Sequence, residues 1–310
     1  AYNGDKAYVW SNLANPTLGW EKSASFNVGL DWNLYGRLGI TVEYYNKLTK
    51  DLLFEMPTSY VTGFGSKMSN IGNLRNSGFE ITLNSINIRN KNFSWETDFN
   101  ITFQKNIVVS LPNHEDVLYG HDGMYLLREG ESMHTFYVPI AKGLNDETGL
   151  MEFWADPEDH SKGVVTKWAD AKPGIAGKAV PDILGGMTNT INWKGLDFSF
   201  MFTFQTGSSL FDYPGYFLEN SDGVRIGSFA PMAIVAGKYW TGPGQGAVYP
   251  KPIANNPYRS DKFSSRTIVK NDNVRMRDIT LGYTLPVKKS VFNRLRLYVR
   301  APNPFLIYNA

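Results

Sequence analysis

The stretch LDFSFMFTFQ, residues 196–205, decides the fold of this chain. From Leu196 to Phe204 every second residue is Leu or Phe, whereas Asp, Ser, Met, Thr and Gln fill the other positions. Successive side chains of a β-strand point to opposite faces, so the pattern predicts a strand with one apolar and one polar face. A helix would scatter the large apolar residues around its circumference. Met201 is the one apolar residue on the polar face.

The same alternation recurs along the chain and predicts seven more strands. They cover residues 25–34, 38–54, 74–88, 93–108, 183–193, 274–285 and 294–302, and the quoted strand runs over residues 196–206. Many approach the ~9–11 residues that a tilted strand needs to cross a bilayer, whereas strands of soluble proteins usually have ~5–6. The apolar faces are rich in aromatic residues, and the polar faces carry many small and amide side chains.

Short and long connections alternate between these strands. Tight turns are predicted at Tyr35-Gly36, at residues 89–92 and at Lys194-Gly195, with a slightly longer link over residues 286–293. Long segments cover residues 57–71, about 106–181 and about 207–273. Transmembrane barrels have short turns at the periplasmic rim and long loops at the outer rim, so the alternation favours an antiparallel transmembrane β-barrel. A soluble β-sandwich would also show alternating strands and is the alternative.

The direction of the strands predicts that the barrel is incomplete. If the short turns are periplasmic, the first predicted strand descends and the last one ascends, so the chain ends on the outer side. Barrels of this kind bring both termini to the periplasmic side. We therefore expect at least the closing strand to be missing, and the long loops indicate a piece of a larger barrel.

The composition excludes several classes of protein. Lys and Arg total 31 and Asp and Glu total 29, a formal net charge of +2 that argues against a nucleic-acid binder with a broad basic face. The absence of Cys excludes disulfides, thiolate metal sites and a Cys nucleophile. No stretch approaches the ~18 consecutive apolar residues of a membrane-spanning helix.

No catalytic, cofactor-binding or metal site is predicted, and we expect no enzymatic activity. His114, His121, His134 and His160 lie in one long loop, but no pair has the HxH or HxxxH spacing of metal ligands, which favours solvated loop residues. The Gly-rich residues 242–246 lack the Lys-Ser/Thr ending of a phosphate loop. No GxSxG nucleophile elbow occurs.

Aromatic residues of the long loops are the candidates for contact with a solute or a partner protein. They are Trp154, Trp168, Tyr213, Tyr216, Tyr239 and Trp240, together with Phe217. Flat rings beside polar groups suit stacking on sugars or packing against a protein. The alternative is that these rings form small cores of the loops themselves.

Five segments stand out, in chain order: NPTLGWEK (15–22) with NVGLD (27–31), EYYNKLTKDLL (43–53), NIGNLRNSGFE (70–80), GLDFSF (195–200), and RDITLGYTLP (277–286) with LRLY (295–298). Together they resemble segments of the SusC-like (RagA-like) TonB-dependent outer-membrane transporters. The segments span nearly the whole chain, which makes the match specific.

The resemblance implies a barrel of about 22 strands with an N-terminal plug domain. Residues 1–310 match only the later strands, about the last third to half of that barrel, or roughly its fourteenth to twenty-first strands. The plug domain, the segment that contacts TonB, the early strands and the closing strand are expected to be absent. Many relatives carry an acidic DxNxDG stretch in the long loop, but residues 156–163 read DPEDHSKG, so calcium binding is not expected.

The resemblance also implies part of a bacterial outer-membrane transporter that imports a large solute, either a glycan fragment or an oligopeptide. The implied partners are a SusD-like surface lipoprotein, TonB acting through the missing plug region, and outer-membrane lipid, with no nucleic acid and no cofactor. The alternative function is a soluble β-rich carbohydrate-binding or adhesion module. Extraction separates the two, because a barrel requires detergent and a soluble module does not.

Overall fold

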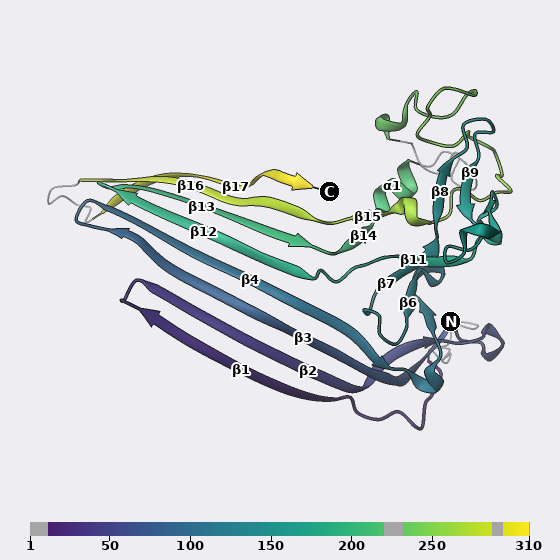
Figure 1. The fold of residues 1–310 in the computed structure, drawn as a ribbon, viewed down its shortest axis with the longest axis horizontal. Coiled ribbons are helices and arrows are strands. Elements are labelled where there is room, and N and C mark those ends of the chain that lie inside the picture. Colours follow the sequence, from purple (N-terminus) through teal and green to yellow (C-terminus); the bar gives the residue numbers. More distant parts are fainter. Residues whose placement is uncertain (1–11, 220–231, 287–293, 310) are drawn as a thin grey trace, which may run out of the picture.

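A large antiparallel sheet dominates the computed structural model, which describes residues 12–219, 232–286 and 294–309 (Figure 1). In spatial order the eight strands that it contains within these residues are β1 (Lys22–Leu34), β2 (Leu38–Pro57), β3 (Ser66–Arg89), β4 (Phe93–Ser110), β12 (Ile183–Trp193), β13 (Leu196–Thr206), β16 (Asn273–Leu285) and β17 (Leu295–Asn309). Their spatial order is their order along the chain. The eight predicted strands are confirmed.

The predicted long connection over residues 57–71 is wrong. β2 continues to Pro57 and β3 starts at Ser66, so only residues 58–65 connect them. Asp51 and Gly72 adopt positive φ angles of 55° and 44°, and neither has a partner in the β2–β3 ladder. The register is unchanged across this irregularity, because Lys50 pairs with Asn73 and Leu52 pairs with Ile71. The outer end of β3 could not be predicted because residues 66–71, SKMSNI, show no apolar alternation.

The tight turns lie at one end of the sheet. Lys194 and Gly195 have φ angles of 47° and 88° and join Trp193 directly to Leu196, as a two-residue hairpin turn requires. Tyr35 and Gly36 also have positive φ. The predicted link over residues 286–293 lies outside the described residues apart from Pro286.

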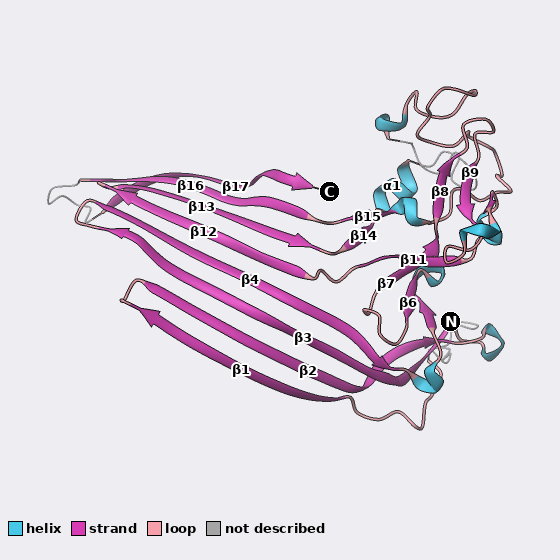
Figure 2. Cartoon of the chain, in the orientation of Figure 1, coloured by secondary structure: helices cyan, strands magenta, loops and turns pink. Residues whose placement is uncertain are grey.

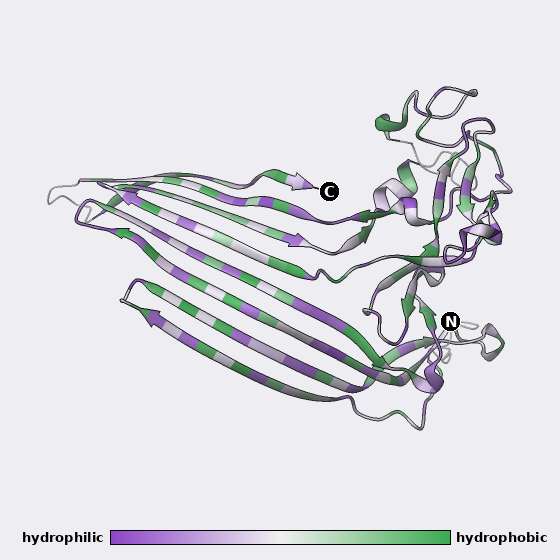
Figure 3. Cartoon of the chain, in the orientation of Figure 1, coloured by the Kyte–Doolittle hydropathy of each residue, from purple (hydrophilic) through white to green (hydrophobic). Residues whose placement is uncertain are grey.

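The alternation seen in the sequence separates the two faces of the sheet. Figure 3 shows apolar and polar residues alternating along the strands. Tyr44, Phe79 and Phe103 stand side by side on β2, β3 and β4, with the rings of Tyr44 and Phe79 4.9 Å apart. Phe79 is 52% exposed and Val299 of β17 is 75% exposed, so the described residues leave this apolar face uncovered. Such an extended uncovered face suits contact with lipid.

One polar group on the apolar face is satisfied by its neighbours. Asn189 of β12 shares its face with Met187 and is only 4% exposed. Its side-chain oxygen accepts hydrogen bonds from the Trp95 indole at 2.8 Å and the Thr97 hydroxyl at 2.7 Å, both on β4. These bonds pair groups that lipid could not hydrate.

The long connections contain smaller elements that the alternation did not predict (Figure 2). The strands are β5 (Val117–Tyr119), β6 (Tyr125–Leu127), β7 (Thr135–Pro139), β8 (Ala141–Leu144), β9 (Met151–Trp154), β10 (Val164–Val165), β11 (Pro173–Lys178), β14 (Ser209–Phe211) and β15 (Ile268–Lys270). The helices are α1 (Tyr213–Leu218) and the short 3-10 helices η1 (Tyr60–Thr62), η2 (Pro112–His114), η3 (His121–Gly123), η4 (His160–Lys162), η5 (Trp168–Asp170), η6 (Ala233–Val235) and η7 (Ser265–Thr267). None of the helices described is long and apolar enough to cross a membrane.

The substitution Asn189→Leu should lower the free energy of unfolding by about 1–3 kcal/mol, because the Trp95 and Thr97 donors would lose their acceptor in an apolar environment. Denaturant unfolding of the full-length protein in lipid vesicles measures this change. Met187→Leu, on the same face of the same strand, is the control and should cost under about 1.5 kcal/mol. Equal losses for the two variants would contradict the assigned role of Asn189.

Candidate functional site

The long connections fold into a packed structure at one end of the large sheet (Figure 1). We call the described parts of residues 111–182 and 207–272 the loop cap. Its first core joins it to the sheet and consists of Ile71, Leu74, Val108, Leu111 and Leu127. The second contains Met124, Val138, Tyr216 and Phe263, and the third contains Met151, Phe153 and Ala171. The buried apolar residues make the loop cap a folded unit.

Two of the candidate aromatic residues belong to these cores. Tyr216 of α1 is 2% exposed and packs in the second core. Trp168 lies between the second and third cores, and its indole nitrogen donates to the Phe263 carbonyl at 2.7 Å. In this conformation Tyr216 presents almost no surface to a solute.

Three more candidates are partly buried and held by contacts within the loop cap. The Trp154 ring stacks on His160 with centroids 3.8 Å apart. The Trp240 indole donates to the Asp146 carbonyl at 2.6 Å, and Tyr239 donates from its hydroxyl to the Glu219 carbonyl at 3.2 Å. Each ring still presents some surface, so a contact with a solute stays a prediction for these three.

Tyr213 is the most accessible of the six candidates. Its side chain stands at the start of α1 and is 59% exposed. The Phe217 ring contacts it at a centroid distance of 4.7 Å, and the Phe211 ring contacts it at 6.0 Å. A ring that is held by neighbours and still exposed can stack on a sugar or pack against a partner. The sequence could not predict that Tyr213 is exposed and Tyr216 is buried. Tyr216 is buried because Phe263 and Met124, which are distant in the sequence, pack against it.

The four histidines of the loop cap are exposed, as the sequence predicted. His114 contacts the Glu129 carboxylate at 2.9 Å, and His134 contacts the Tyr119 hydroxyl at 2.7 Å. Within residues 12–219, 232–286 and 294–309, no group of three or more His, Asp and Glu side chains could hold a metal ion. His114 and His134 therefore contact other side chains of the loop cap.

Asp156 is clamped by lysines at the position where relatives are expected to carry an acidic stretch. Its side chain is 10% exposed and accepts from Lys162 at 2.8 Å, from Lys172 at 3.3 Å and from the backbone N–H of Glu158 at 3.0 Å. The hydrogen bonds from Lys162 and Glu158 lower the pKa of the Asp156 carboxyl to about 2. The two ammonium groups therefore stabilise the ionised form of the Asp156 carboxylate.

The polar face of the large sheet has ion pairs near one edge. Arg296 of β17 donates to Asp197 of β13 at 2.9 Å, and Arg300 of β17 pairs with Asp278 of β16. These side chains come from three strands that are neighbours in the sheet. This part of the face therefore carries paired charges.

The opposite half of the polar face carries two facing carboxylates. Glu43 of β2 stands directly opposite Glu80 of β3 in the register, and Tyr45 lies beside them. Ser25 and Asn27 of β1 and the cationic Lys47 of β2 also line this hollow of about 340 Å³. Like charges at opposed positions repel each other. The polar face thus presents charged groups of both signs.

Comparison with known sequences finds a related family. The model of the "TonB dependent receptor-like, beta-barrel" family matches residues 1–132. The chain is 31% identical to TonB-dependent receptor P3 of Formosa agariphila over 95% of its own length and 30% of that relative. It is 28% identical to TonB-dependent receptor SusC of Bacteroides thetaiotaomicron over 98% of its length and 30% of that protein. The chain spans about a third of the length of such relatives.

Comparison with solved structures supports the barrel fold. A chain of the RagAB peptide transporter superposes with a TM-score of 0.80 at 24% identity, covering 99% of this chain and 34% of that one. The large sheet is therefore an unclosed part of an antiparallel β-barrel, since β1 and β17 have no second neighbour in the described sheet. A two-layered soluble sandwich is not the observed architecture.

Acid should loosen the loop cap as the pH falls from 3.8 to about 2. The depressed pKa means that ionised Asp156 stabilises the fold above the unfolded value, and that this stabilisation is lost as the pH falls through the folded value. Near-ultraviolet circular dichroism of the full-length protein follows the change.

Asp156→Asn should remove this part of the pH dependence, and Asp170→Asn, at an exposed position, is the matched control. An acid transition unchanged by Asp156→Asn would contradict the role of the lysine clamp.

Proposed function

We propose that this chain, which belongs to the SusC-like family of TonB-dependent receptors, forms one wall of an importer for a large solute. The protein lies in the bacterial outer membrane. The observation that carries the proposal is the division of the large sheet, whose uncovered apolar face suits lipid and whose other face carries polar and charged groups. The loop cap sits at the rim where a solute would arrive from outside.

The solute that we propose is a glycan fragment or an oligopeptide. Exposed Tyr213 offers a stacking surface, and the opposed Glu43 and Glu80 offer acceptors for hydroxyl or amino groups. SusC is similar to this chain in sequence, and a chain of the RagAB peptide transporter is similar to it in fold.

Two protein partners follow from the proposal. A SusD-like surface lipoprotein would cover the loop cap, and TonB would act through a plug domain outside residues 1–310. Residues 1–310 would then supply the C-terminal part of the barrel, with no catalytic role. Import would draw on the energy that TonB delivers, because a polar wall alone provides only a path for the solute.

Uptake by cells that express the full-length protein with its lipoprotein tests this function. Labelled oligosaccharides and labelled oligopeptides of similar mass are offered in parallel, with and without TonB. We expect uptake of one class that depends on both TonB and the lipoprotein. TonB-independent uptake, or chemical turnover of the solute by the purified protein, would contradict the proposal.

Tyr213→Ala should weaken solute binding by about 2- to 10-fold, corresponding to the roughly 0.5–1.5 kcal/mol of one aromatic contact. Isothermal titration of the full-length complex with the transported solute measures the loss. Tyr35→Ala is the matched control, because Tyr35 is 99% exposed in a tight turn at the opposite rim. Unchanged affinity for Tyr213→Ala would exclude Tyr213 from the solute site.

A further inference from the structure

Three cations form a row on the apolar face of the large sheet, toward the end that carries the loop cap. Lys50 of β2, Arg75 of β3 and Lys105 of β4 are all exposed, and we call them the cationic row. Leu48, two positions before Lys50, stands opposite Arg75, and Ser77, two positions after Arg75, stands opposite Lys105. Each cation is therefore the diagonal neighbour of the next, at a spacing of about 7–8 Å.

The register places the cationic row on the side of the sheet that suits lipid. Each cation lies an even number of positions from an aromatic residue of the apolar face on the same strand, and the pairs are Lys50 with Tyr44, Arg75 with Phe79, and Lys105 with Phe103. The ladder is continuous between the members of each pair, so both point to the same side. Glu43 and Glu80 lie at odd offsets and point to the other side. A molecule in the lipid therefore reaches the cationic row without crossing the wall.

The protein does not neutralise the charge of the cationic row. Within residues 12–219, 232–286 and 294–309, none of its members forms an ion pair with a carboxylate. Asp51, which follows Lys50 in the sequence, lies 3.8 Å from the Lys22 ammonium instead. The Glu21 carboxylate accepts a hydrogen bond from the backbone N–H of Leu53 at 3.3 Å. Because like charges at diagonal positions repel each other, an anion between them is favourable.

The cationic row lies at the level of lipid headgroups. Its members are about 14 residues along their strands from the tight turns, which is roughly 35 Å at ~3.3 Å per residue and a strand tilt of ~40°. A bilayer has a hydrocarbon core of ~30 Å and measures ~40–45 Å with its headgroups. With the tight turns at the inner interface, the cationic row reaches the headgroups of the outer leaflet.

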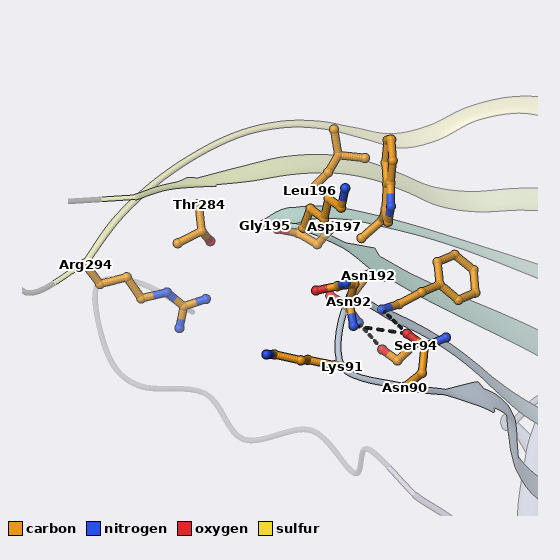
Figure 4. Close-up of a pocket in the computed structure, with 13 residues that line it drawn as sticks. Asn90, Lys91, Asn92, Ser94, Asn192, Gly195, Leu196, Asp197, Thr284 and Arg294 are labelled. Atoms are coloured by element: carbon orange, nitrogen blue, oxygen red, sulfur yellow. Dashed lines mark hydrogen bonds between the residues drawn. The ribbon is translucent and has the colours of Figure 1, made fainter. Parts of the chain in front are cut away.

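The cations at the tight turns are arranged differently. Figure 4 shows Lys91 and Arg294 beside a hollow at that end of the sheet, which Lys194 also lines. Ser94 and Asn192, which share a hydrogen bond of 3.1 Å in this hollow, belong to the water-facing side of β4 and β12. These two lysines and one arginine match the cationic row in charge but do not form a row on the apolar face, so they provide a control.

We propose that the cationic row binds an outer-leaflet lipid with more than one phosphate on its headgroup, one phosphate between Lys50 and Arg75 and another between Arg75 and Lys105. Ammonium and guanidinium groups bind phosphate through charge-assisted hydrogen bonds. Two strand spacings of ~4.8 Å and four residues of ~3.3 Å give the row a length of roughly 16 Å, which exceeds the size of a single phosphate. The acyl chains would lie along the apolar face, over Phe79 and Phe103.

Titration of the full-length protein in detergent with purified lipopolysaccharide that carries two lipid-A phosphates, followed by native mass spectrometry, tests the proposal. The triple variant Lys50→Gln, Arg75→Gln, Lys105→Gln should bind this lipid about 10- to 100-fold more weakly, as expected for the removal of three charges. The matched control Lys91→Gln, Lys194→Gln, Arg294→Gln removes the same charge at the tight turns and should leave binding unchanged.

Two further comparisons separate the role of charge from a folding defect and identify the lipid. Lys50→Arg with Lys105→Arg keeps the charge and should retain binding, which should weaken with added salt. Dephosphorylated lipopolysaccharide and phosphatidylglycerol, which has one phosphate, should both bind the unaltered protein more weakly than the intact lipid. Unchanged binding by the triple variant, an equal loss in the tight-turn control, loss in the arginine variant, or binding of either comparison lipid as tight as that of lipopolysaccharide would overturn the proposal.

Discussion

The whole structure depends on one constraint, which is that backbone groups inside a bilayer must find their hydrogen-bond partners within the protein. β12 and β13 meet it by pairing without interruption from Ile183 opposite Thr206 to Trp193 opposite Leu196. Continuous pairing fixes the face of each residue, because a slip of one position would turn the Phe residues of β13 toward the polar side. The lipid surface and the water-facing surface therefore arise from the same ladder.

The loop cap and the tight turns answer different demands at the two ends of the wall. The tight turns need only reverse the chain, and positive φ at Lys194 and Gly195 achieves this in two residues. The long connections must fold in water, so they build cores around Phe153 and Phe263 and use Trp168 and Tyr216 as packing residues. Only side chains that these cores leave exposed can contact a solute or a partner. Tyr213 is the clearest example.

Most of the wall could be predicted from the sequence, whereas much of the loop cap could not. Alternation over eleven residues located β12 and β13 at their observed bounds. It failed at the outer end of β3, because residues 66–71, SKMSNI, show no apolar alternation. Strands such as β9, with four residues, are too short to show a period, and no spacing rule reports that Tyr216 is buried while Tyr213 is exposed. Those outcomes depend on contacts between distant segments.

Site-directed spin labelling along residues 196–205 tests the central claim most directly, since residues 1–310 contain no native Cys to interfere. Single Cys substitutions of the full-length protein in lipid vesicles are labelled, and collision rates with oxygen and with a water-soluble nickel complex are compared. The account predicts a period of two, with even-numbered positions accessible to oxygen in lipid and odd-numbered positions accessible to nickel. Access of nickel to both sets of positions would contradict a membrane-spanning wall.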